Sequence, residues 1–125
     1  MTSARWSGKS LHPQVRAIAN AIVREARADG IPAVITSGYR SLAKQRTLYA
    51  RYRRGGPLAA APGNSAHNFG LAVDIAIQGA ARTDRRYRTL HRLGRRAGLV
   101  TLRGEQLEAD PYHFEVPDWR TWITR

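Results

Sequence analysis

The feature that most constrains this chain is an aspartate inside an apolar segment. Residues 70–77 read GLAVDIAI, and Asp74 lies between Val73 and Ile75 in a run that is otherwise typical of a buried strand. A carboxylate in such surroundings is costly unless a cation or strong hydrogen-bond donors compensate its charge. The rest of the chain must therefore supply a partner for Asp74.

Two histidines are candidate partners for this aspartate. His67 precedes Asp74 in SAHNFGLAVDIA (65–76), and His113 lies downstream in DPYHFE (110–115). The chain has no cysteine, which excludes disulfides and thiolate metal ligands. Two histidines and one carboxylate suit zinc, with a fourth position left to water, and a bound dication would neutralise the aspartate. A single histidine on a strand is more often an ordinary hydrogen-bonded residue, so the combination carries the interpretation.

Hydrophobic periodicity and turn residues predict the order of the elements. The pattern predicts helices over 10–30, over 41–53 and from Thr83 or Asp84 to Gly98, and strands over 33–37, 70–77, 99–102 and 112–116. Residues 53–65, rich in Gly and Pro, are expected to form a loop, and residues 117–125 a short turn or helix. Since helices and strands do not alternate regularly, we expect an α+β fold with a small antiparallel sheet flanked by helices. The length and the lack of a linker predict one domain over residues 1–125.

The charge balance points to an anionic partner. The chain has 21 Lys and Arg residues against 9 Asp and Glu residues, a net charge of +12. Nucleic acid and the anionic polymers of a bacterial envelope are both candidates, and RYRRGG (51–56) beside Tyr49 could bind bases and phosphates. A genome that favours Arg and Ala codons explains the same composition equally well. No run of about eighteen apolar residues exists, so we expect no membrane span.

Three ordered sequence blocks resemble those of a known family. SGYRS (37–41) is followed by SAHNFGLAVD (65–74), which fits S-x-H-x-x-G-x-A-x-D, and by DPYHFE (110–115), in which an acid precedes a histidine by three residues. Together they resemble the zinc D-Ala-D-Ala carboxypeptidase and L-alanyl-D-glutamate peptidase family, peptidase family M15, which includes VanX- and VanY-like enzymes and small single-domain phage endolysins. The resemblance implies the α+β zinc-peptidase fold that the Hedgehog signalling domain shares.

The resemblance also implies a role for each matching residue. It implies that zinc is held by His67, Asp74 and His113, that Asp110 is the catalytic base, that Arg40 polarises the scissile carbonyl and contacts substrate, and that Ser65 orients the substrate or His67. General chemistry agrees, since a carboxylate beside the attacking water can take its proton. A guanidinium fork likewise suits an oxyanion or a carboxylate.

Other acids and histidines leave alternatives open. Glu115 shares a strand face with His113, so we expect it either to support that histidine or to pair with an arginine. Glu105 and Glu108 are rival candidates for the base, because residues 98–111 lack the Trp- and Gly-rich stretch of related endolysins. His12 and His91 lie outside the three blocks, and we expect structural or solvent-exposed roles for both.

The function expected from these observations is hydrolysis of peptidoglycan stem peptides at the L-Ala-D-Glu bond, leading to lysis of the cell wall. The alternative within the family is a D-alanyl-D-alanine carboxypeptidase. More distant alternatives are a basic nucleic-acid-binding module and a zinc protein of the same fold that has lost catalysis. The N-terminal residues contain no apolar segment of a secretory signal. We therefore expect an endolysin that stays in the cytoplasm of an infected host until it is released to the cell wall. We also expect the protein to be a monomer.

Overall fold

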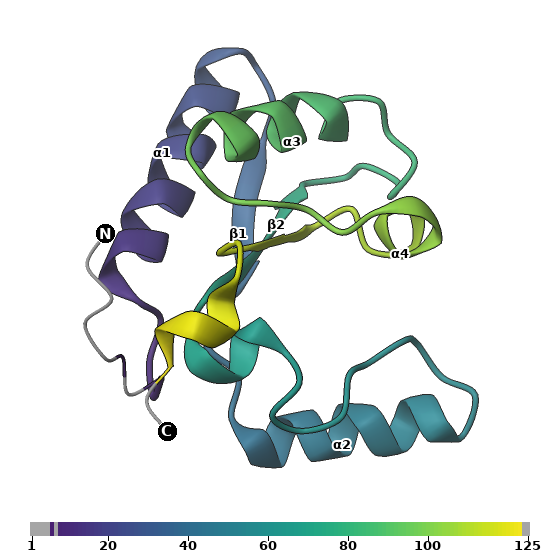
Figure 1. Ribbon diagram of the computed structural model, residues 1–125. Coiled ribbons are helices and arrows are strands. Elements are labelled where there is room, and N and C mark those ends of the chain that lie inside the picture. The colour runs from purple at the N-terminus through teal and green to yellow at the C-terminus, as the bar shows by residue number, and fades with distance from the viewer. Residues whose placement is uncertain (1–5, 7, 124–125) are drawn as a thin grey trace.

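The computed structural model describes residue 6 and residues 8–123 of the chain. Its elements follow the order α1 (Pro13–Ala28), β1 (Ala33–Ser37), α2 (Leu42–Arg53), the 3₁₀-helix η1 (Ala66–Phe69), β2 (Ala72–Ile77), α3 (Tyr87–Arg96), α4 (Gly104–Ala109), β3 (His113–Glu115) and the 3₁₀-helix η2 (Trp119–Trp122). α1 and α3 lie beside each other, while α2 lies apart at the opposite end of the molecule (Figure 1). The expected α+β fold is confirmed.

The central strand β2 explains how an aspartate fits an apolar segment. β2 pairs antiparallel with β1 on one side and with β3 on the other. Side chains alternate between the two faces of a strand, so Val73 and Ile75 point into the core while Asp74 points to the other face. There the cross-strand partner of Asp74 is His113. The apolar neighbours of Asp74 and the carboxylate itself therefore occupy different environments.

The core lies between the sheet and helices α1 and α3. α1 begins at Pro13, and the ring of His12 caps it by accepting a hydrogen bond from the Gln14 N–H at 3.1 Å. In α3, Gly94 lets the helix approach the ring of Phe114, since a Cβ at that position would lie 2.7 Å from the ring. Phe114 is fully buried, so one face of β3 packs into the core. The opposite face of β3, with His113 and Glu115, lines the cleft.

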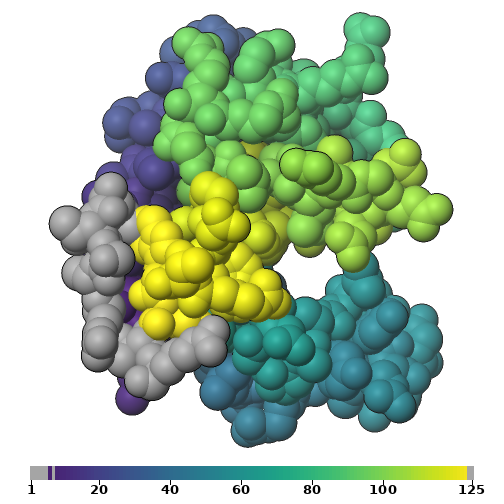
Figure 2. Space-filling view, viewed as in Figure 1, coloured from purple at the N-terminus to yellow at the C-terminus, as the bar shows by residue number. Residues whose placement is uncertain are grey.

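The helices α2 and α4 border a cleft on the other face of the sheet. The Ser41 hydroxyl caps α2 as predicted, accepting from the Lys44 N–H at 3.1 Å. Gln45 is the one buried residue of α2, and α4 has none, so both helices stand outside the core. Figure 2 shows the molecule hollowed between them. The cleft has a volume of about 530 Å³, and His67 and His113 on this face of the sheet line it.

The segment before the last histidine differs from the prediction. Residues 99–102 do not form a strand, and Val100 makes only an isolated bridge with Glu115. Residues Gly104–Ala109 instead form α4, which the sequence did not reveal because a short helix without buried residues has no apolar periodicity. α3 also begins later than predicted, at Tyr87, because residues 81–86 form turns in which the Asp84 carboxylate accepts the Arg86 N–H.

Residues 1–5, 7, 124 and 125 lie outside the described part of the chain. The expectations for the N-terminal segment and for the last two residues of 117–125 therefore concern residues that the structure does not describe. Of the helices in the described part, none combines the length and apolar character needed to cross a membrane.

Candidate metal centre and catalytic site

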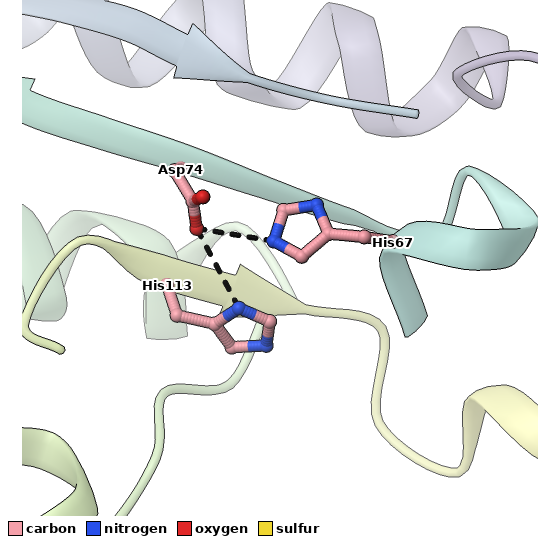
Figure 3. Close-up of side chains that lie close together, drawn as sticks. All are labelled: His67, Asp74 and His113. Atoms are coloured by element: carbon pink, nitrogen blue, oxygen red, sulfur yellow. Dashed lines mark hydrogen bonds and ion pairs between the residues drawn. The ribbon is translucent and has the colours of Figure 1, made fainter. Parts of the chain in front are cut away.

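Three side chains from different elements meet on the cleft side of the sheet. His67 comes from η1, Asp74 from β2 and His113 from β3 (Figure 3). The Asp74 Oδ1 atom lies 3.1 Å from His67 Nε2 and 3.5 Å from His113 Nδ1. Within the described part of the chain, these are the residues whose ligand atoms gather within 4.8 Å of one another. The structure thus brings together the three residues that the sequence proposed as ligands.

The local sequence explains why His67 reaches this position. The Ser65 hydroxyl caps η1 by accepting a hydrogen bond from the His67 N–H at 3.3 Å. Gly70 ends η1 in the left-handed conformation, with φ of 68°, and a Cβ there would lie 1.8 Å from the Ser10 carbonyl oxygen. The chain can therefore turn from η1 into β2 only with glycine at this position, which fixes the spacing between His67 and Asp74.

Each histidine has its second ring nitrogen engaged. His67 Nδ1 lies 2.7 Å from the Gly38 carbonyl oxygen, and His113 Nε2 lies 2.7 Å from Glu115 Oε1. Both oxygens are acceptors, so each of these nitrogens carries a proton, and the opposite nitrogen faces Asp74, where its lone pair could bind a metal ion once that nitrogen has lost its proton. This is the outer-sphere arrangement that orients histidine ligands of metals. Of the two expectations for Glu115, support of His113 is confirmed.

The electrostatics of the three residues are those of a site that requires a positive charge. Burial alone would raise the pKa of Asp74, but hydrogen bonds to His113 and His67 outweigh it and hold that pKa well below its ordinary value. Burial alone would lower the pKa of His113, but hydrogen bonds to Asp74 and Glu115 raise it to about 9. A proton on His113 therefore balances Asp74 when no metal ion does. Two imidazole nitrogens and a carboxylate oxygen converging on one point fit zinc.

Zinc affinity is expected to rise about tenfold for each pH unit between pH 7 and pH 9, because the proton on His113 must leave before Nδ1 can bind a metal ion. Above the pKa of about 9 this contribution ends, since His113 is then already neutral. Competition against a chromophoric chelator, corrected for the chelator's own protonation, measures the dependence. An affinity that does not change over this range would show that His113 releases no proton when zinc binds.

Asp110, the residue expected to be the catalytic base, lines the same cleft as two of the candidate ligands. It follows α4 directly, precedes the buried Pro111, and lines the cleft together with His67 and His113. Burial raises the pKa of the Asp110 carboxyl, and the negative charge of Asp74 raises it further, which favours a group that exchanges protons. The rivals Glu105 and Glu108 are exposed residues of α4 that do not line the cleft.

Arg40 is held at the edge of the same site. Its guanidinium lies 3.8 Å from Asp74 Oδ2 and donates a hydrogen bond of 3.1 Å to Gln45 Oε1. Its backbone N–H donates to the His67 carbonyl at 2.9 Å. Both Arg40 and Ser65 line the cleft, so their expected contacts with substrate remain predictions that the geometry permits.

Two supporting residues, Gln45 and Asn68, were not identified from the sequence, and a third, His91, has the structural role that was one of the two expected for it. The buried Gln45 donates to the Ala60 carbonyl at 2.7 Å while it accepts from Arg40, which ties α2 to the loop beside the site. Asn68 donates to the Arg40 carbonyl at 3.1 Å. His91 is buried, and its Nε2 lies 2.8 Å from the Pro111 carbonyl oxygen, next to Asp110. Asn68 lies inside a recognised block, which was the available signal, whereas the other two contacts depend on tertiary structure.

Comparison with known proteins finds relatives with related activities. The family model of VanY, D-alanyl-D-alanine carboxypeptidase, matches residues 8–115. The peptidoglycan L-alanyl-D-glutamate endopeptidase CwlK of Bacillus subtilis is 44% identical over 71 residues, which is 54% of this chain and 42% of the relative. A D-alanyl-D-alanine carboxypeptidase of Enterococcus faecalis is 35% identical over 91 residues, which is 60% of this chain and 34% of the relative. The chain thus spans less than half the length of these two curated relatives.

A solved structure extends the similarity to three dimensions. The vancomycin-resistance D,D-pentapeptidase VanY from a VanB-type resistance cassette, in complex with Zn(II), superposes with a TM-score of 0.67 at 27% identity. The superposition covers 90% of this chain and 76% of that chain. The fold expected from the three sequence blocks is thereby confirmed.

Proposed function

The chain belongs to the VanY family of D-alanyl-D-alanine carboxypeptidases, and on that premise we propose that it is a zinc-dependent peptidase that cuts the L-Ala-D-Glu bond of peptidoglycan stem peptides. The observation that favours an endopeptidase is the shape of the cleft, since the hollow between α2 and α4 passes from one face of the molecule to the other in Figure 2. A polymer that continues on both sides of the scissile bond needs such a passage. The similarity to the endopeptidase of Bacillus subtilis supports the same bond.

The residues of the site have distinct tasks in this proposal. A bound zinc ion would polarise the scissile carbonyl and lower the pKa of water at the site toward about 7. Asp110 takes the proton of the attacking water and delivers it to the leaving amine. Arg40, already oriented by Gln45, directs its remaining N–H groups at the oxygen on which negative charge develops. Glu115 and the Gly38 carbonyl keep the two histidines in the orientation that binds metal.

The D-alanyl-D-alanine carboxypeptidase is the second candidate, favoured by the family description and by the relative from Enterococcus faecalis.

Two synthetic peptides separate the candidates, one containing only the L-Ala-D-Glu bond and one ending in D-Ala-D-Ala. We expect the zinc-loaded protein to cleave the first much faster. Release of D-alanine from the second peptide, with the first left intact, would establish the carboxypeptidase instead. A nucleic-acid-binding module would leave the convergence of His67, Asp74 and His113 unexplained.

An endolysin released from the cytoplasm of an infected host is the biological setting that we propose for this activity. The net charge of +12 supports attraction to anionic polymers of the envelope.

Lysis of intact walls is then expected to fall steeply as salt rises from 0.01 M to 0.1 M, because the screening length shortens from about 30 Å to about 10 Å. Turbidity assays measure this fall, and cleavage of a short soluble peptide should fall much less. The same salt sensitivity in both assays would show that the charge does not serve targeting.

A further inference from the structure

Two arginines of the cleft have no part in the catalytic steps described above. Arg51 belongs to α2 and Arg120 to η2, and both line the cleft that contains His67 and Asp110. Among residue 6 and residues 8–123, neither guanidinium forms an ion pair with a carboxylate. Two unpaired cations on the walls of one cleft suit a ligand that carries negative charge.

Arg51 lies in a part of the chain that has no negative charge of its own. No acidic residue occurs between positions 30 and 73, a range that includes all of α2 and the loop leading to η1. Gln45, Leu48 and Arg51 follow one another at three-residue intervals and line the cleft together, so they share one face of the helix. Arg51 is therefore about 9 Å along the helix axis from Gln45, the residue that orients Arg40. The cationic lining of the cleft therefore extends from Arg40 to Arg51.

Arg120 is fixed in place by an aromatic neighbour. Its guanidinium carbon lies 4.2 Å from the centroid of the Trp119 ring. Trp119 is buried and stacks on Phe69 with a centroid separation of 5.5 Å. One flat face of the guanidinium is thus covered by the ring, while no residue in the described part of the chain accepts a hydrogen bond from its N–H groups. Such a pre-oriented group loses little conformational freedom on binding.

We infer that Arg51 and Arg120 bind free carboxylates of the stem peptide, so that amidated stems are poorer ligands. The inference rests on the proposed function. The D-Glu of a stem peptide is linked onward through its side-chain carboxyl and keeps its α-carboxylate free. A guanidinium binds a carboxylate with two parallel N–H donors. Amidation removes the charge and replaces one acceptor oxygen with a donor.

Binding measured without turnover tests the inference. Zinc-loaded Asp110→Asn protein is titrated by calorimetry with two synthetic stem peptides, one with free carboxylates and one with the same carboxylates as amides. We expect the free peptide to bind at least about tenfold more tightly, the size of one charge-assisted contact at an accessible site. Adding Arg51→Gln or Arg120→Gln should each weaken the free peptide by about tenfold and leave the amidated peptide unchanged. The matched control is Arg88→Gln, an exposed arginine of α3 outside the cleft, which should alter neither affinity.

The outcomes separate this inference from the proposed function. Equal affinity for the two peptides, including no binding of either, overturns the inference, and so does a loss that the glutamine variants cause for both peptides alike. Hydrolysis by the unaltered protein is measured on the same peptides. A protein that prefers the charged peptide but cleaves neither keeps the carboxylate site and loses the proposed function. A protein that cleaves the peptides and binds the charged and the amidated form equally keeps the proposed function and loses the carboxylate site.

Discussion

Replacing Asp110 with asparagine is expected to lower turnover by about 10²- to 10⁴-fold, the range that a general base contributes. Asparagine has the same shape but cannot take a proton, so zinc content and thermal stability should stay near those of the unaltered protein. Asp110 lines the cleft beside His67 and His113, and burial raises the pKa of its carboxyl. The effect should fall on kcat more than on KM, because the proton moves in the transition state. Steady-state hydrolysis of a stem peptide measures it.

Glu108→Gln is the matched control for this variant. Glu108 lies on α4 two positions before Asp110 but is exposed and outside the cleft. Its replacement removes a carboxylate of the same segment and should leave turnover within about twofold, as expected for a surface substitution. An active Asp110→Asn variant beside an inactive Glu108→Gln variant would assign the base to α4.

Replacing His67 with alanine is expected to remove stoichiometric zinc and, with it, measurable hydrolysis. His67 supplies one of three converging ligand atoms, and its loss should weaken zinc by more than the 10- to 100-fold caused when only an outer hydrogen-bond partner is lost. A zinc ion held by these three ligands would link η1, β2 and β3, so its removal should also lower the unfolding temperature. A ligand present at 1,000 times its dissociation constant stabilises the folded state by about 4 kcal/mol. Elemental analysis and thermal unfolding with and without chelator measure both effects.

A histidine outside the site provides the control for the zinc variant. His12 caps α1 through its ring nitrogen, and asparagine can supply the same cap. His12→Asn should therefore retain zinc, activity and most of the stability. A His67→Ala protein with undiminished zinc would exclude His67 as a ligand.

The site was predictable from the sequence to the extent that it depends on short-range spacing. The three-residue spacing of Asp110 and His113 and the glycine turn between His67 and Asp74 are local properties, and both pairs lie as expected. The period of two residues along a strand also predicted that Glu115 shares a face with His113. These features could be predicted from the sequence because strands and tight turns determine side-chain direction locally, independently of the rest of the fold.

Features that depend on packing between distant segments were not predictable in this way. The helix Gly104–Ala109 buries nothing and carries no periodic pattern, so the sequence predicted no element between the expected strands 99–102 and 112–116. Gln45 shows no sign in the sequence that it bonds to the Ala60 carbonyl and to Arg40. That Arg51 and Arg120 line the same cleft likewise becomes evident only when α2 and η2 are placed in space.

The bond that is cut tests the central claim most directly. Purified peptidoglycan is digested with the zinc-loaded protein, and the soluble products are identified by mass spectrometry, with His67→Ala protein as the blank. We expect stem peptides with a new N-terminal D-Glu, left after cleavage from L-Ala, and none in the blank. Release of free D-alanine without any new N-terminal D-Glu would contradict the assignment of the bond and establish the carboxypeptidase in its place.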